Sequence, residues 1–345
     1  MNVLLMGLGG VGQRHLRILK EINPLINIYA VRSKNRKGEI SDQMQLDESI
    51  DIIDKYNITS CKTIEDAAKF KMDFAIVSNP TSLHVQTTLI LLKYKIPVLI
   101  EKPLSNSDKG IKEIRDLSIK NHTIISVAFM MRYHPCLVKL RGYIDSQSIG
   151  KIYNISINVN SFFPAWHNYE KYNSFYAGRK DLGGGVILTE IHEVDLLSEL
   201  FGKPQYVFAI GGKMSNLDID VEDNASILMK FDKGPNYFSA TVNMSFVQRT
   251  PLRTLQVFGE EGNILWDISS QTISINNYVN DLSENYSFKD FNRNDMFKEQ
   301  LINFINIIHE DGDAKISNAL ESALNAHEIA MAIKKSMNNG ALVAL

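Results

Sequence analysis

The chain has 345 residues, which is enough for about two domains at roughly 150 residues each. Hydrophobic residues make up 44% and charged residues 22%, so the composition is that of a globular protein with a large core, and it argues against a disordered chain. The 37 Lys and Arg residues nearly balance the 39 Asp and Glu residues, and the formal net charge is −2. This balance argues against a nucleic-acid-binding protein, which would show a basic excess.

Cysteine spacing and apolar runs exclude further classes of site. The two cysteines, Cys61 and Cys136, form no Cys-x-x-Cys motif, and no Cys/His cluster has the spacing of a zinc site, so we expect no metal. The first apolar run has no basic segment before it and meets glycines at once, so we do not expect it to be a signal peptide. No run approaches about 18 apolar residues. We therefore expect a soluble, cytoplasmic protein that binds no membrane.

Short apolar runs alternate with amphipathic stretches in the first third of the chain. The runs are expected to be strands, and the stretches are expected to be helices because their apolar residues recur at helical spacing. This alternation is typical of βαβ units, and it predicts an α/β domain with a doubly wound parallel sheet over residues 1–128. The expected strands are residues 3–6, 26–31, 74–77, 98–100 and 124–129, and the expected helices are residues 12–22, 82–94 and 108–120.

The pattern changes after about residue 150, where apolar and polar residues alternate, as in an antiparallel sheet with one wet face. We predict an α+β domain with a large, mostly antiparallel sheet over residues 129–345, and the sequence leaves open whether its last helix returns to the first domain. We expect one face of this sheet to be apolar enough to pair with a second copy, giving a dimer or tetramer. The expected strands are residues 151–162, 206–210, 225–231, 236–246, 252–258, 262–267 and 272–275, and the expected helices are residues 186–201, 295–310 and 319–338.

A glycine-rich turn lies between the first expected strand and the first expected helix, and it matches G-x-G-x-x-G. This context is the one that the dinucleotide-binding fingerprint requires, although an ordinary glycine-rich turn is the alternative. The first glycine would permit the turn, the second would let a pyrophosphate approach, and the third would let helix and strand pack closely. The residues expected to bind NAD or NADP here are Gly7, Gly9, Gly10, Val11 and Gly12.

The second expected strand ends in Arg32, Ser33 and Lys34, where an NAD-preferring site usually has an acidic residue. An arginine at this place accommodates the 2′-phosphate of NADP. We therefore expect Arg32 and Ser33 to bind the cofactor and NADP to be preferred. The alternative is that these are solvated loop residues and that the cofactor is NAD.

Glu101, Lys102 and Pro103 follow the expected strand at residues 98–100. The carboxyl ends of strands are where doubly wound sheets bind ligands. Lys102 could stabilise developing alkoxide charge there or pass a proton, and Glu101 could orient it. On the spacing alone, a solvated Glu-Lys pair at a strand end fits slightly better.

His192 follows three glycines, residues 183–185, in the expected helix at residues 186–201. Asp195 comes three residues later and Thr189 three residues earlier, so each side chain would lie about 60° from that of His192 around one helix. A histidine near an acid can act as a general acid or base at neutral pH. A histidine hydrogen-bonded at a domain interface is the alternative, and the pattern alone favours it.

Taken together, these motifs resemble the Gfo/Idh/MocA family of NAD(P)-dependent oxidoreductases, which act mainly on sugars and polyols. The resemblance rests on residues 7–16, 78–84, 101–104 and 183–195, and it covers nearly the whole chain. It implies a Rossmann-type first domain and hydride transfer between the nicotinamide and a secondary alcohol or ketone of a sugar, polyol or sugar derivative. It implies that Lys102 touches the reacting oxygen and that His192 is the general acid or base. The further cofactor contacts expected are Ser78, Asn79, Pro80, His84, Glu101 and Lys102.

Many family members carry an Asp three or four residues before the histidine, where this chain has Thr189 and Leu188. Either another acid substitutes, or the lysine and the histidine suffice. The departure leaves open a dinucleotide-binding regulator or scaffold without turnover, since fold does not imply function. A reductase of a non-sugar substrate on the same fold is a further alternative. The acids that could substitute are Glu190, Glu193 and Asp195.

Candidate substrate contacts come from three places in the chain. Arg132 follows the last expected strand of the first domain and could bind an anionic group or form a salt bridge that links the domains. An aromatic loop precedes the three glycines, and its ring faces and polar tips suit a sugar, although packing of the loop on the sheet explains it almost as well. The expected substrate contacts are Arg132, Trp166, His167, Tyr176, Thr189 and His192.

Overall fold

The computed structural model of the protein describes residues 1–32, 38–233, 236–309 and 313–345. The chain divides into two compact units. The first change of unit comes one residue after the predicted boundary at residue 128, and two later segments also belong to the first unit, one of which includes the start of the last helix. The first unit comprises Met1–Phe129, Pro164–Gly184 and Phe297–Leu324, and the second comprises Met130–Phe163, Gly185–Met296 and Asn325–Leu345.

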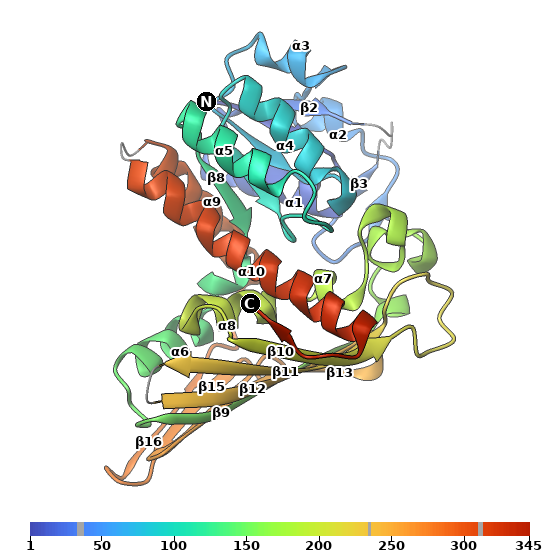
Figure 1. The fold of residues 1–345 in the computed structure, drawn as a ribbon. Helices are drawn as coiled ribbons and strands as arrows, with labels where there is room; N and C mark the ends of the chain where they lie inside the picture. The colour runs from blue at the N-terminus through green and yellow to red at the C-terminus, as the bar shows by residue number, and fades with distance from the viewer. Residues whose placement is uncertain (33–37, 234–235, 310–312) are drawn as a thin grey trace. The chain divides into compact units, whose positions relative to one another are not determined.

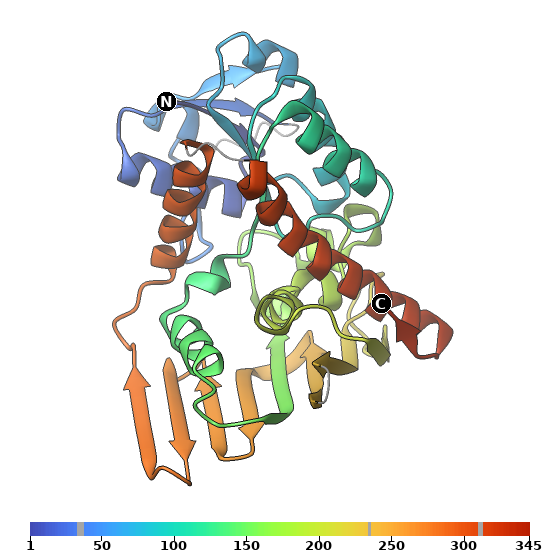
Figure 2. The ribbon, with the colours of Figure 1, turned by 60° about the vertical axis from the view of Figure 1, so that its left-hand side comes forward.

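The first unit is built on a six-stranded parallel sheet in the order β5-β2-β1-β6-β7-β8, which confirms the predicted Rossmann-type fold. Helices lie on both sides of this sheet (Figures 1 and 2). The strands β6 and β7 are therefore buried along their whole length, and this is why they read as continuous apolar runs. The strands are β1 (Asn2–Met6), β2 (Asn27–Val31), β5 (Thr59–Cys61), β6 (Phe74–Val77), β7 (Val98–Glu101) and β8 (Ile125–Ala128).

The helices of this unit include two segments from the last part of the chain. Phe304 of α9 packs edge-on against Phe74 of β6, with 5.4 Å between the ring centroids, and Lys298 forms an ion pair with Glu21 at 2.6 Å. The sequence did not predict the short elements α2, α3, β3, β4 and β5. The elements are α1 (Gly10–Ile22), β3 (Glu39–Ile40), β4 (Leu46–Asp47), α2 (Ile52–Lys55), α3 (Ile64–Ala68), α4 (His84–Lys93), α5 (Ile111–Asn121), α9 (Arg293–His309) and α10 (Asp313–Asn339), of which α9 and α10 each change unit along their length.

The second unit is built on a nine-stranded sheet in the order β16-β15-β14-β13-β9-β12-β11-β10-β17. Neighbouring strands pair antiparallel, except that β12 runs parallel to β9, so the predicted mostly antiparallel sheet is confirmed. The strands β16 and β17 were not predicted. The strands are β9 (Ile152–Phe162), β10 (Tyr206–Gly212), β11 (Asn224–Lys233), β12 (Asn236–Ser245), β13 (Val247–Gly259), β14 (Gly262–Asp267), β15 (Thr272–Asn277), β16 (Leu282–Ser287) and β17 (Val343–Ala344).

Helices α6 (Pro135–Asp145), α7 (Val186–Thr189) and α8 (His192–Phe201) lie over one face of this sheet, whose inward side chains are buried (Figure 2). Along residues 154–160 of β9 and 239–245 of β12, the side chains on the other face are half-buried or exposed, and they are uncharged and polar. The expectation of an apolar face is therefore wrong for these central strands, because their outward positions carry amides and hydroxyls. The residues are Asn154, Ser156, Asn158 and Asn160 of β9, and Ser239, Thr241, Asn243 and Ser245 of β12.

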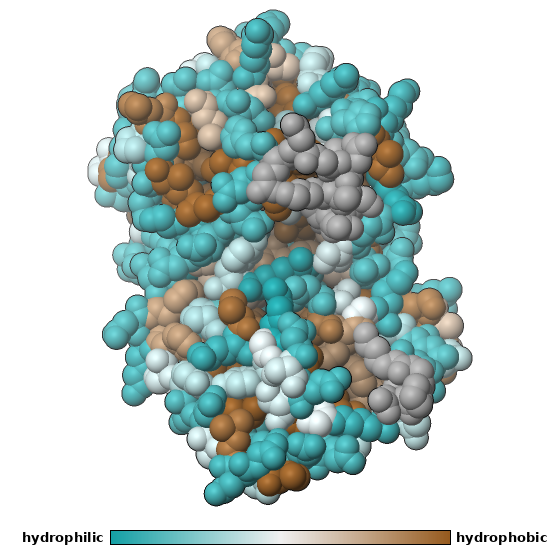
Figure 3. All heavy atoms as spheres, turned by 90° about the vertical axis from the view of Figure 1, so that its left-hand side faces the viewer, coloured by the Kyte–Doolittle hydropathy of each residue, from teal (hydrophilic) through white to brown (hydrophobic). Residues whose placement is uncertain are grey.

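Hydrophilic residues cover most of the face that Figure 3 shows, and hydrophobic residues form small groups between them. Within the described ranges, no helix is long and apolar enough to cross a membrane. No group of three or more His, Cys, Asp or Glu residues that could hold a metal ion occurs among the same residues.

Candidate functional site

The glycine turn of the first unit joins β1 to α1. Gly7 has a φ of +105°, a conformation that favours glycine. A Cβ added at Gly12 would lie 2.4 Å from the carbonyl oxygen of Gly7 and 2.8 Å from Ser78 Oγ, so a side chain has no room there. A Cβ added at Gly9 would meet no described atom within 4 Å. The turn is thus closely packed at Gly12 and open at Gly9.

The open side of the turn faces the start of α1. Gly9, the N-cap residue, gives this helix no side-chain cap, and the first N–H groups of a helix have no partner within it. These groups and the positive end of the helix dipole suit the phosphates of a dinucleotide. The loop after β6 lies against the turn, because the Ser78 N–H donates to the carbonyl oxygen of Met6 at 3.0 Å and the Ser78 hydroxyl donates to that of Gly7 at 3.0 Å. The structure therefore brings the predicted loop at Ser78 and Asn79 to the predicted glycine turn.

The turn that carries Lys102 follows the next strand of the sheet, β7. Glu101 ends that strand and is buried, with 8% of its surface exposed, whereas Lys102 is half-buried. A carboxylate oxygen of Glu101 lies 2.6 Å from Nε2 of His15, a fully buried residue of α1. His15 was not among the predicted site residues, because the spacing of α1 assigns it only to the buried side of the helix.

His84 was predicted to contact the cofactor, and the structure places it in the interior, with 1% of its surface exposed. Its Nδ1 lies 2.8 Å from the carbonyl oxygen of Pro103, and its Nε2 lies 2.9 Å from that of Asn79. Burial lowers the pKa of His84, although both carbonyls act to raise it. Both ring nitrogens thus face backbone oxygens of two predicted site loops, so any effect on the cofactor would pass through those loops.

The aromatic loop belongs to the first unit, in the segment Pro164–Gly184 that contains Trp166, His167 and Tyr176. The ring of His167 stacks on Tyr169, with 5.1 Å between centroids, and its Nδ1 lies 3.1 Å from a carboxylate oxygen of Glu170. The Tyr169 hydroxyl lies 3.1 Å from the place that a Cβ of Gly10 would take. This loop therefore reaches the glycine turn, a contact that chain order did not reveal.

The residues predicted to choose between NADP and NAD follow β2. Arg32 is half-buried, and Ser33 and Lys34 lie outside the described residues. The role of these residues in cofactor choice stays a prediction.

The expected single helix at residues 186–201 is two helices, α7 and α8, with Glu190 and Ile191 between them. Glu190 has a ψ of 33°, so the backbone leaves the helical range there. His192 is consequently the first residue of α8, and Thr189 is the last residue of α7. The predicted angle between Thr189 and His192 on one helix is wrong for this reason. Both side chains are buried.

Asp195 lies three residues after His192 in α8, as predicted, and both of its carboxylate oxygens accept hydrogen bonds from Arg132. The Arg132 Nε donates to one oxygen at 2.9 Å, and the Nη2 donates to the other. Burial raises the pKa of Asp195 to about 6, although the arginine acts to lower it. Arg132 therefore forms an ion pair inside the second unit, and its predicted contact with a substrate stays a prediction.

The other two acids beside His192 approach a second arginine, Arg253 of β13. Its Nη2 lies 2.6 Å from a carboxylate oxygen of Glu193 and 3.6 Å from one of Glu190. Burial raises the pKa of Glu193 to about 6. All three acids that could replace the missing Asp are thus held by arginines.

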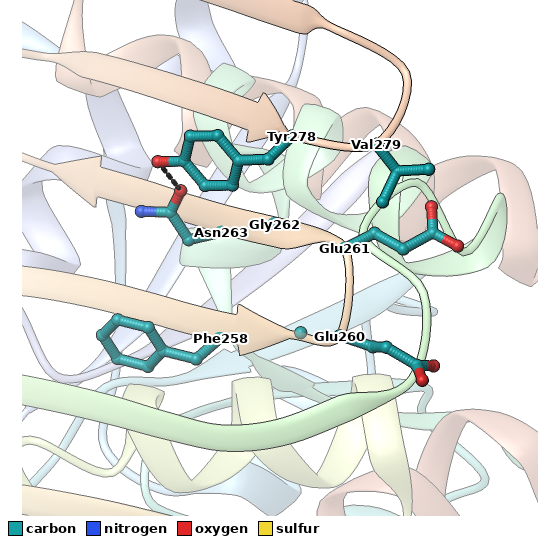
Figure 4. A pocket seen from close by; sticks show the side chains of 8 residues that line it. Phe258, Glu260, Glu261, Gly262, Asn263, Tyr278 and Val279 are labelled. Carbon is teal, nitrogen blue, oxygen red and sulfur yellow. Dashed lines mark hydrogen bonds between the residues drawn. The ribbon is translucent and has the colours of Figure 1, made fainter.

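A pocket lies at one end of the second unit's sheet (Figure 4). The Tyr278 hydroxyl donates to the amide oxygen of Asn263 at 3.4 Å beside it. The pocket contains none of the predicted site residues, so it is not the candidate site. Its lining residues are Phe258, Gly259, Glu260, Glu261, Gly262, Asn263, Tyr278 and Val279.

Replacing Gly9 with Ala should weaken dinucleotide binding and leave the fold intact. Its backbone, with φ −75° and ψ −171°, suits any residue, and the new methyl group would point into open space. That space is where a pyrophosphate would lie, so we expect an affinity loss of about tenfold or more, equivalent to about 1.4 kcal/mol. Fluorescence titration with NADH and NADPH measures the affinity, and urea unfolding measures the stability.

Gly142→Ala is the matched control, because a Cβ there also meets no described atom within 4 Å but the residue lies in α6. It should leave dinucleotide affinity unchanged. Gly12→Ala should instead destabilise the fold, since its Cβ would overlap the carbonyl oxygen of Gly7. Equal affinities of Gly9→Ala and wild type would refute the assignment of the open space.

Two family models match the chain. One, described as the oxidoreductase family with an NAD-binding Rossmann fold, covers residues 1–129, and the other, the GFO/IDH/MocA C-terminal domain, covers residues 137–265. The chain is also similar to the myo-inositol 2-dehydrogenase of Thermotoga maritima, with 24% identity in an alignment 358 residues long that covers 100% of this chain and 98% of that protein. The levoglucosan dehydrogenase of Pseudarthrobacter phenanthrenivorans is 20% identical over 278 residues, covering 73% of this chain and 64% of that protein.

Solved structures share the fold over the whole chain. A levoglucosan dehydrogenase in complex with NADH and levoglucosan has a TM-score of 0.81 at 16% identity, and the match covers 100% of this chain and 99% of that one. The myo-inositol 2-dehydrogenase of Lactobacillus plantarum has a TM-score of 0.75 at 20% identity, with 100% and 99% covered. At 16% and 20% sequence identity, these two similarities show that the fold is shared.

Proposed function

The chain belongs to the Gfo/Idh/MocA family of NAD(P)-dependent oxidoreductases, and from this premise we propose that it oxidises a secondary alcohol of a sugar, polyol or sugar derivative, or reduces the corresponding ketone. The observation that carries the proposal is the first unit's glycine turn, open at Gly9, with the Ser78 loop beside it. Relatives named as dehydrogenases of inositol and of levoglucosan support a substrate with several hydroxyl groups.

The proposed roles divide between the glycine turn and two ionisable side chains. The N–H groups at the start of α1 would hold the dinucleotide, which supplies the hydride acceptor when it is bound. The Lys102 ammonium would hold the substrate oxygen and stabilise its negative charge. His192 would accept the hydroxyl proton during oxidation and return it during reduction.

The acid that many family members place before the histidine is absent here, and the structure bears on what replaces it. Glu193 and Glu190 approach Arg253, and Asp195 pairs with Arg132. We therefore favour a mechanism in which Lys102 and His192 suffice without an acid. A regulator or scaffold that binds the dinucleotide without turnover is the rival, and the same departure supports it.

A panel of sugars and polyols, each assayed with NAD and with NADP, tests the proposal through the absorbance of the reduced nicotinamide. We expect turnover with at least one substrate and, because Arg32 follows β2, a higher kcat/KM with NADP. Dinucleotide binding without any turnover would favour the rival function. A clear preference for NAD would defeat the cofactor assignment alone.

A homo-oligomer formed through the second unit's sheet stays a prediction. Its open face offers uncharged polar side chains on β9 and β12, and apolar ones on β10 and β11, namely Phe208, Ile210 and Leu228. A cytoplasmic location also stays a prediction.

A further inference from the structure

We propose that two buried histidines, His15 and His84, are positioning residues that fix the turn carrying Lys102. The inference rests on the proposed function, in which Lys102 acts on the substrate oxygen. Lys102 is half-buried, whereas Glu101, Pro103, Leu104 and the following Ser105 are buried. The lysine side chain thus emerges from a turn whose neighbouring residues are held in the interior.

His15 holds the residue before the lysine. Its Nε2 lies 2.6 Å from Oε1 of Glu101, and its Nδ1 has no hydrogen-bond partner among the described residues. The edge of the ring meets Phe297, with 5.8 Å between centroids, which fixes the orientation of the imidazole. Among the described residues, Glu101 is therefore the one hydrogen-bond partner of this fully buried ring.

His84 holds the residue after the lysine. Its Nδ1 meets the carbonyl oxygen of Pro103 at 2.8 Å, and its Nε2 meets that of Asn79 at 2.9 Å. One imidazole thus lies between the lysine turn and the loop predicted to line the nicotinamide side of the cofactor, within hydrogen-bond distance of a carbonyl oxygen of each. The distance between these two loops depends on this ring.

Packing alone does not account for the two histidines. Burying an imidazole is unfavourable unless it is hydrogen-bonded, and an apolar side chain would fill the same space without that penalty. The two rings come from different helices, α1 and α4, yet they bond to the residues directly before and after Lys102. Positioning of that lysine is the function that both bonds share.

The first test is kinetic. His15→Leu and His84→Leu should each lower kcat/KM by about tenfold to a hundredfold, since a displacement of about 1 Å at a reacting group has an effect of this size. Each change should have no further effect when it is added to Lys102→Met, because both histidines act through that lysine. His15→Gln should recover part of the loss, since its amide can still donate to Glu101. His309→Leu, an exposed histidine of α9, is the control and should change nothing.

The second test does not depend on turnover. Lysines carrying ¹³C-methyl groups give separate NMR signals, and Lys102→Met identifies the signal of Lys102. His15→Leu and His84→Leu, or their Gln variants if the Leu variants do not fold, should shift this signal and leave those of distant lysines in place. An unmoved Lys102 signal, or kinetic losses that add to that of Lys102→Met, would overturn the proposal. A wild type without turnover on any substrate would instead refute the proposed function, and the NMR shift would still decide the positioning role.

Discussion

Replacing Lys102 with Met is expected to lower kcat by about 10²- to 10⁴-fold. Methionine keeps much of the length of the side chain and removes the ammonium that would stabilise the negative charge on the substrate oxygen. Dinucleotide affinity should survive, because the Ser78 loop is held against the glycine turn by hydrogen bonds from Ser78 to the carbonyl oxygens of Met6 and Gly7, which this change leaves in place. Steady-state kinetics with the best substrate of the panel measures kcat, and fluorescence titration measures the affinity.

Lys120→Met is the control for this change, since Lys120 is an exposed lysine of α5 in the same unit. It should leave both measurements unchanged. Unaltered turnover in Lys102→Met would remove the lysine from the mechanism. If dinucleotide affinity fell while kcat stayed the same, Lys102 would be a cofactor-binding residue.

Replacing Arg253 with Met should lower the free energy of unfolding by about 3–5 kcal/mol at pH 8, because it leaves a buried carboxylate without its counter-charge. Glu193 is 3% exposed, and Arg253 is its ion-pair partner at 2.6 Å. Glu190 lies 3.6 Å from the same guanidinium, so its carboxylate would lose a neighbouring positive charge as well. Urea unfolding of variant and wild type measures the loss.

The loss should shrink at pH 5. Burial raises the pKa of Glu193 from 4.5 to about 6 in the folded wild type, and removal of Arg253 should raise this pKa further. When folding raises the pKa of an acid, protonation of that acid stabilises the folded protein. This stabilisation is complete at pH values below the pKa of the unfolded chain, and it is lost as the pH rises through the pKa of the folded protein. At pH 5 the carboxyl is therefore largely neutral in both proteins, and the missing arginine matters less.

Lys203→Met provides the comparison, because Lys203 and Glu328 form an exposed ion pair at 2.8 Å, with 42% and 54% of the side chains exposed. Such a pair contributes about 0–1 kcal/mol, so its removal should lower the free energy of unfolding far less than the loss of Arg253. A loss for Arg253→Met as small as that for Lys203→Met, or equal at both pH values, would contradict the account of this buried pair.

The sequence predicted most of the two sheets, for reasons that individual strands make clear. The strands β6 and β7 lie in a parallel sheet between layers of helices, so they are continuous apolar runs. The strand β9 has one covered face, so its buried residues alternate with polar ones. Two-residue strands such as β3 are too short to show either pattern.

The break between α7 and α8 could not be predicted, because apolar residues continue at helical spacing through residues 186–201. The ion-pair partners of the acidic residues in α8 could not be predicted from the sequence either. Asp195 pairs with Arg132 across 63 positions, and Glu193 pairs with Arg253 across 60. Local spacing could propose only a neighbour on the same helix, which is why Asp195 was matched with His192.

The order of the elements along the chain also does not show which compact unit contains each segment. The aromatic loop at Pro164–Gly184 follows the first strand of the second unit's sheet, yet it belongs to the first unit. Hydrophobic periodicity reports which face of an element is buried, but it does not report which core receives that face. The contact between Tyr169 and the glycine turn depends on this long return of the chain.

The two-residue strand β17 covers part of one edge of the nine-stranded sheet. It pairs with Tyr206 and Val207 of β10, and the Leu345 N–H donates to the carbonyl oxygen of Gln205 at 3.2 Å. An exposed edge strand presents a row of unpaired backbone N–H and C=O groups. Strands of other molecules can pair with such a row, and this pairing leads to aggregation. Ile210 of β10 is 61% exposed and lies beyond the two paired residues, so β17 covers the part of this edge at Tyr206 and Val207. The pairing of β17 with β10 therefore disfavours edge-to-edge association of two copies of this sheet.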